Sequence, residues 1–70
     1  MEANTPVRYS GLELKLQRVA ADIRAADLAA EMGVHPSRVH YIEGRRVTSV
    51  GAAEQYLTAL ATLTTKTTAA

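Results

Sequence analysis

The 70-residue chain is predicted to fold as one small all-α domain of four helices. Apolar residues recur at spacings of three and four in four successive stretches, which is the period of one helical face. Glycine, proline or serine separates these stretches, and such residues commonly begin or end helices. Many of the hydrophobic residues are alanine, and Trp and Phe are absent. This composition favours helices packed closely through small side chains.

Composition narrows the function. The chain has no cysteine, which excludes disulfides and thiolate metal sites. No apolar run is long enough to span a bilayer and no export leader precedes the domain, so a cytoplasmic protein without a membrane partner is expected. We find no nucleophile–base pair, metal-ligand set or phosphate loop, so neither an enzyme nor a cofactor is expected. The net charge of +1 is low for a nucleic-acid binder, and its distribution matters more than its sum.

Residues 1–9 show no period and are predicted to form a flexible arm. Ser10 and Glu13 have the spacing of a capping box, which predicts the start of the first helix. Two stripes run along this helix: Leu12, Leu16, Val19 and Ile23 form one, and Leu14, Arg18 and Ala21 form the other. Both cannot face one core, so the helix either buries a wide face or presents one stripe to a partner.

The next two helices are joined by a sharp turn. Leu28 and Met32 share one face of the second helix, and Val39 and Ile42 share one face of the third. Gly33 between them can adopt the left-handed conformation that ends a helix. Two short helices with apolar inner faces and a glycine turn predict a helix-turn-helix, whose second helix can enter a DNA groove.

This stretch resembles the lambda repressor and Cro-like helix-turn-helix family, also called the XRE family. The resemblance covers about residues 12–46 and rests on the pattern Leu28-Ala29-x-x-Met32-Gly33-Val34-x-x-x-x-Val39-x-x-Ile42-Glu43. It implies a lambda repressor-like domain that binds double-stranded DNA through the major groove. It also implies that Arg18 pairs with Glu43, at the end of the third helix. The chain departs from the family at the start of the second helix, where Arg24 replaces a serine or threonine cap and Ala25 replaces a phosphate-binding glutamine.

The candidate DNA-binding residues are Arg24, His35, Pro36, Ser37, Arg38, His40, Tyr41, Arg45 and Arg46. The resemblance implies that Pro36, Ser37 and Tyr41 occupy base-contacting positions, flanked by Arg38 and His40. Arginine can read guanine through two parallel hydrogen bonds, whereas arginines beyond the helix end, such as Arg45 and Arg46, can reach phosphates.

For Arg24, His35 and His40, roles other than a direct DNA contact are also considered. Arg24 could add positive charge at the start of the second helix, where free N–H groups attract anions. His35 is expected to cap the third helix or to face a phosphate. The spacing of five between His35 and His40 is poor for a shared metal site, so no metal is expected.

The fourth helix is predicted to start after a Thr48 or Ser49 cap and to run to about Leu63. This places the helix-turn-helix domain at residues 10–63 and a disordered tail at residues 64–70. The helix carries a wide apolar face: Val50, Ala53, Leu57 and Leu60, widened by Tyr56 and Leu63. A homodimer through this helix is expected, the alternative being that Leu60 belongs to the core of a monomer.

These features predict a sequence-specific DNA-binding transcriptional regulator. The resemblance favours a repressor that covers promoter DNA, similar to a phage Cro-type regulator; an antitoxin or a restriction-modification controller would have the same features. Ala25 and the low net charge leave open a helical protein-interaction module with weak or no independent DNA binding.

Overall fold

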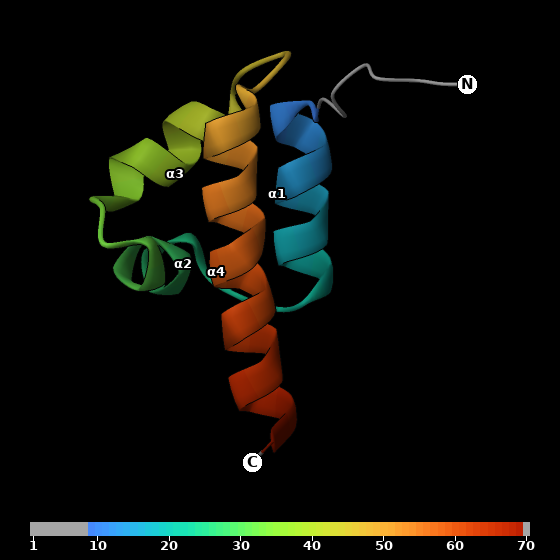
Figure 1. Cartoon of the computed structure of the whole chain (residues 1–70), viewed down its shortest axis with the longest axis vertical. Helices are drawn as coiled ribbons and strands as arrows, with labels where there is room; N and C mark the ends of the chain where they lie inside the picture. Colours follow the sequence, from blue (N-terminus) through green and yellow to red (C-terminus); the bar gives the residue numbers. More distant parts are fainter. Residues whose placement is uncertain (1–8, 70) are drawn as a thin grey trace.

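The computed structural model describes residues 9–69, and the surroundings of side chains as far as Lys66. This part of the chain holds four helices and no strand: α1 is Gly11–Ala20, α2 is Ala25–Met32, α3 is Pro36–Glu43 and α4 is Val50–Ala69. α4 runs the length of the molecule, with α1 on one side of it and α2 and α3 on the other (Figure 1). The fold is therefore the predicted all-α, four-helix arrangement. None of the helices in the described segment is long and apolar enough to cross a membrane.

α1 buries only one of its two apolar stripes. The capping box forms as predicted, since the Ser10 hydroxyl accepts the Glu13 N–H and the Glu13 carboxylate accepts the Ser10 N–H. Leu14 and Arg18 face the core. The stripe of Leu12, Leu16 and Val19 remains 60%, 58% and 56% exposed. Ile23, the last predicted member of this stripe, lies beyond the end of α1 and packs against the core. The wide buried face is therefore excluded, and the other three residues of the stripe are left exposed.

The turn between α2 and α3 has the predicted form. Gly33 has a φ of 73°, the left-handed conformation that ends a helix without a steric cost at glycine. The N–H of Val34 then donates to the carbonyl of Ala29 at 2.9 Å. Leu28 and Ala29 of α2 are fully buried in one core cluster, together with Val39 of α3.

Ala29→Leu is expected to destabilise the fold. The side chain of Ala29 is fully buried, so three added carbon atoms must displace neighbours in a packed core. Such overpacking costs about 1–3 kcal/mol. Thermal or urea unfolding measures the effect, and Ala26→Leu, at an exposed position of the same helix, is the control. Equal stability of the two variants would mean that α2 does not pack closely through Ala29.

The start of α1 is bound to the loop that joins α3 and α4. The N–H of Gly11 donates to the carbonyl of Arg45 at 2.8 Å. The buried Thr48 donates to the carbonyl of Tyr9 through both its N–H and its hydroxyl, at 2.8 and 2.9 Å. Tyr9, the last residue of the predicted arm, packs against the core; residues 1–8 lie outside the described part.

Most of the apolar face of α4 is buried against the other helices of the same chain. Ser49 caps the helix, because its hydroxyl accepts the N–H of Ala52 at 3.1 Å. Ala53 and Tyr56 are buried, and Leu60 is only 6% exposed. Leu60 lies in the core of one chain. It is therefore not accessible for the dimer contact expected through this helix.

α4 also ends later than predicted. The helix continues past Leu63 to Ala69, so the predicted end near Leu63 is wrong and the segment expected as a disordered tail is helical as far as Ala69. The structure shows two contacts made by the extended segment. The hydroxyl of Thr64 donates to the carbonyl of Leu60 one turn earlier, at 2.8 Å, and Lys66 forms a 3.1 Å ion pair with Glu31 of α2. Neither interaction depends on an apolar period.

Candidate nucleic-acid interface

α3 is anchored at its end by a buried polar network. Arg18 of α1 donates to both carboxylate oxygens of Glu43, from Nε at 2.7 Å and from Nη2 at 3.2 Å. This is the two-bond pair implied by the resemblance. A third Arg18 nitrogen donates to the carbonyl of Ile23 at 2.9 Å. Tyr56 of α4 donates its O–H to Glu43 at 2.5 Å, so the network joins α1, α3 and α4.

Tyr56 was not predicted as part of this network. In the sequence it only widens an apolar stripe, and its hydroxyl gives no signal of its partner. Charge pairing keeps Glu43 ionised inside the protein. Burial raises the pKa of this carboxyl, but hydrogen bonds from Arg18 and Tyr56 outweigh burial and hold its pKa below the ordinary value. Burial, followed by the hydrogen bond to Glu43, raises the pKa of the Tyr56 hydroxyl.

The inward orientation of Glu43 leaves the outer surface of α3 basic. Between Met32 and Ala53 the sequence contains one acidic residue, Glu43, and its charge is compensated by Arg18. Arg38, Arg45 and Arg46 in the same segment are exposed. A net charge of +1 for the whole chain therefore understates the positive charge available at this surface.

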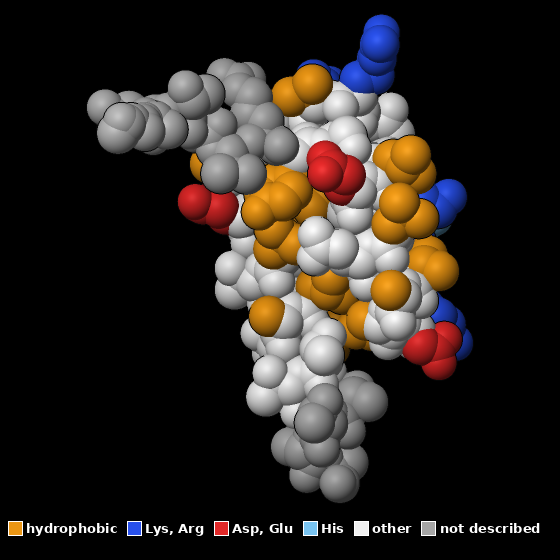
Figure 2. Space-filling view, turned by 90° about the vertical axis from the view of Figure 1, so that its right-hand side faces the viewer, with side chains coloured by type: hydrophobic (Ala, Val, Ile, Leu, Met, Phe, Trp, Pro, Cys, Tyr) orange, Lys and Arg blue, Asp and Glu red, His pale blue; other side chains and the backbone are white. Residues whose placement is uncertain are grey.

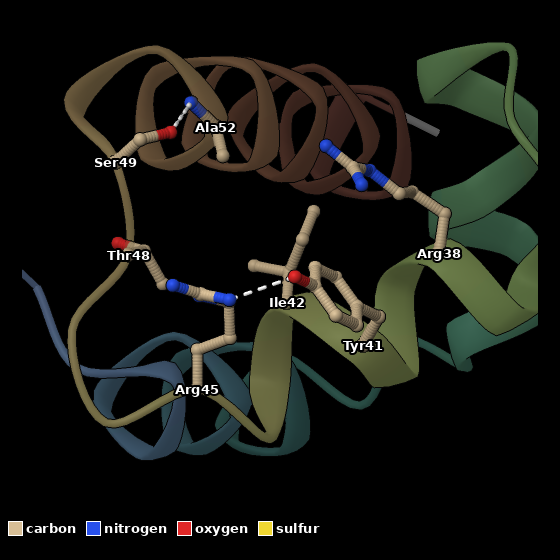
Figure 3. Close-up of a pocket in the computed structure, with 7 residues that line it drawn as sticks. All are labelled: Arg38, Tyr41, Ile42, Arg45, Thr48, Ser49 and Ala52. Atoms are coloured by element: carbon tan, nitrogen blue, oxygen red, sulfur yellow. Dashed lines mark hydrogen bonds between the residues drawn. The ribbon is translucent and has the colours of Figure 1, made fainter.

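Two of these arginines stack on Tyr41. The guanidinium carbons of Arg38 and Arg45 each lie 5.4 Å from the centre of the Tyr41 ring. Arg45 also donates from Nη1 to the Tyr41 hydroxyl at 2.7 Å. Figure 3 shows the two arginines approaching Tyr41 from two sides, Arg38 from α3 and Arg45 from the following loop. We call Arg38, Tyr41 and Arg45 the arginine–tyrosine stack.

The arginine–tyrosine stack lines an open pocket of about 230 Å³. The opposite wall is formed by Thr48, Ser49 and Ala52, at the start of α4 (Figure 3). Thr48 and Ser49 were predicted only as caps, because a cap signal does not show which surface the helix start will face. A pocket with two guanidinium groups and a helix start favours an anion such as a DNA phosphate.

The remaining candidates on α3 are also accessible. Ser37 and His40 are exposed and Pro36 is half-buried. His35 caps the helix, as expected, because its Nδ1 accepts the N–H of Ser37 at 3.1 Å. The Ser37 hydroxyl lies 3.0 Å from the same nitrogen, so a DNA contact by this hydroxyl competes with a contact inside the protein.

Two candidates lie outside the arginine–tyrosine stack. Arg46 lines a neighbouring shallow groove with His40 and Val47. Arg24 is at the start of α2 without a side-chain capping bond, and its Nε forms a 3.1 Å ion pair with Asp27. Both groups of this pair are exposed, so the pair is weak and easily exchanged for a phosphate contact. Within residues 9–69, no cluster of three or more His, Asp or Glu side chains is suited to a metal ion.

Comparison with known proteins agrees with this geometry. A family model described as a helix-turn-helix domain matches residues 11–70, which includes all four helices. Neither the curated proteins nor the solved structures gave a significant match.

Proposed function

This chain belongs to the helix-turn-helix family of XRE-like DNA-binding domains, and from this premise we propose that it is a sequence-specific transcriptional regulator that acts as a repressor. The observation that carries the proposal is the arginine–tyrosine stack on the exposed side of α3. Repression is proposed to be steric, as in a phage Cro-type regulator: the domain covers promoter DNA and excludes polymerase.

Arg38 and Tyr41 are proposed as the base-reading residues. Both are exposed on α3, and the opposite side of this helix is buried through Val39 and Ile42. Arg38 can present two parallel N–H donors to the O6 and N7 atoms of guanine. Stacking on Tyr41 limits the conformations of the guanidinium before DNA binds, which lowers the entropy lost on binding.

Arg45 and Arg46 are proposed to hold the DNA backbone, but in different ways. Arg45 has one donor engaged with the Tyr41 hydroxyl, so it positions that side chain while its other donors can reach a phosphate. Arg46 has no such role and contributes mainly charge. Pro36 and Ser37 are proposed to meet base edges, and Arg24, His35 and His40 to meet flanking phosphates.

Arg38→Ala is expected to cost about 1–3 kcal/mol of affinity for the preferred duplex and to relax the preference at particular base pairs. Arg46→Ala is expected to weaken binding to all duplexes similarly and to lower the salt slope of binding by about one unit. The measurement is fluorescence anisotropy in a salt series, with a duplex selected from random DNA and with its scrambled version.

Two further variants sharpen this experiment. Lys66→Ala removes the same charge near the far end of α4 and should leave both affinities unchanged. Tyr41→Phe keeps the ring but removes the hydroxyl that Arg45 binds, so it should lose less affinity than Tyr41→Ala. Equal losses on both duplexes for every α3 variant would show that α3 does not read sequence. Absence of wild-type binding at low salt would instead favour a protein-interaction module.

A further inference from the structure

The exposed stripe of α1 has no role in the fold or in the proposed DNA interface. Leu12, Leu16 and Val19 are the three most exposed large hydrophobic side chains in the described part of the chain. The other exposed large hydrophobics, Tyr41, Val47 and Val50, lie on or beside the α3–α4 surface. Figure 2 looks onto the side of the molecule on which α1 lies, and hydrophobic side chains gather along that side.

The stripe has the spacing of a helix-pairing seam. Leu12, Leu16 and Val19 follow one another at intervals of four and three, the alternation that keeps apolar residues on one line between two paired helices. α1 already packs its other side on the core through Leu14 and Arg18. The seam is therefore additional to the core, and burial of its apolar surface would be favourable.

We propose that α1 binds α1 of a second copy of this chain, with the two helices antiparallel. In this arrangement Leu16 of each copy packs against Val19 of the other. Lys15, beside Leu16, then comes within reach of Asp22 of the second copy, just beyond the helix end. Both residues are exposed, and neither forms an ion pair with any residue that the structure describes. One pair of charges beside the seam, Lys15 and Asp22, is thus opposite in sign between the two copies.

The size of the seam sets the strength of this contact. A helix of ten residues is about 15 Å long, and three side chains on it cannot bury the roughly 800 Å² per partner typical of a stable complex. The dimer is therefore weak and depends on concentration. It is also distinct from a dimer through α4, because Leu60 is already buried within one chain.

Sedimentation velocity of the full chain from about ten micromolar to about one millimolar tests the proposal. The wild type is expected to shift from monomer towards dimer. Leu16→Glu should lower the association constant at least tenfold, because it places a charge in the apolar seam. Gln17→Glu adds the same charge at an exposed α1 position outside the stripe and should associate like the wild type. Circular dichroism of each variant confirms that it is folded.

A charge exchange makes the test specific for the antiparallel arrangement. Lys15→Glu should weaken association, since it would face Asp22, and the double variant Lys15→Glu/Asp22→Arg should restore it. A wild-type monomer throughout the concentration range would overturn the proposal, as would equal association of Leu16→Glu and the wild type. Failure of the double variant to restore association would overturn the antiparallel pairing. None of these results depends on DNA binding, so they leave the proposed function to its own test.

Discussion

Glu43→Gln is expected to destabilise the domain by about 3–5 kcal/mol, because it leaves the buried Arg18 without its compensating carboxylate. A domain of this length has a total stability of about 4–10 kcal/mol, so the variant should be largely unfolded at moderate temperature. Chemical unfolding followed by circular dichroism measures the loss. A loss below about 1 kcal/mol would show that Arg18 and Glu43 are not coupled in the folded protein.

The free energy of unfolding of Glu43→Gln is also expected to depend on pH differently from that of the wild type. The folded-state pKa of Glu43 lies below its ordinary value of 4.5, so the carboxylate contributes stability above that value. This contribution is lost as pH falls through the lower, folded-state pKa. The stability difference between the wild type and Glu43→Gln should therefore be largest near neutral pH and should narrow below about pH 4.5. A difference that stayed constant between pH 7 and pH 3 would contradict this assignment.

Tyr56→Phe measures the contribution of the Tyr56 hydroxyl to stability apart from that of the Arg18–Glu43 ion pair. The variant keeps the buried ring and the Arg18–Glu43 bonds, but it removes the O–H that donates to Glu43. A loss of about 1–3 kcal/mol is expected, smaller than that of Glu43→Gln, because only one donor to a charged group is removed. The reverse order of the two losses would mean that Tyr56, and not Arg18, is the principal partner of Glu43.

Gly11→Ala should be the most damaging replacement by a single methyl group. A Cβ atom at Gly11 would overlap the carbonyl oxygens of Ile42 and Glu43 at the end of α3. These are backbone atoms, so they cannot move aside as a flexible side chain would. Separation of α1 from α3 would also lengthen the 2.8 Å hydrogen bond from Gly11 to Arg45. We expect a loss of about 3 kcal/mol, at the upper end of overpacking effects, measured by thermal or urea unfolding.

Gly51→Ala is the matched control. Gly51 lies in the first turn of α4, and a Cβ atom there would meet no other atom within 4 Å. The same chemical change should therefore stabilise the protein by about 0.4–1 kcal/mol, because alanine loses less conformational entropy in a helix. Similar effects at both positions would show that α1 does not approach α3 as closely as the structure has it.

Local patterns in the sequence determined the helices and the turn. The Ser10–Glu13 capping box and the left-handed Gly33 depend on interactions within a few residues, so short-range spacing was enough to predict them. The outward direction of Ser37, Arg38, His40 and Tyr41 followed from the buried Val39–Ile42 face of the same helix. The Arg18–Glu43 pair spans distant positions, and only the family resemblance indicated it.

Only the tertiary structure decided which face of α1 is buried and which side chains of α3, α4 and the loop between them contact one another. Of the two stripes on α1, the one that contains Arg18 is buried, and the more apolar Leu12–Leu16–Val19 stripe is exposed. The buried stripe lies on the side where Gly11 closely approaches the end of α3. The sequence predicts only a phosphate contact for Arg45, and the structure adds a hydrogen bond from Arg45 to the Tyr41 hydroxyl. In the helical segment after Leu63, Lys66 of α4 forms an ion pair with Glu31 of α2. The approach of Gly11 to α3 and the Lys66–Glu31 pair join residues far apart in the chain. The Arg45–Tyr41 bond spans only four residues, but it crosses the end of α3 at Glu43, where the helical period stops. A local period contains no information about any of these contacts.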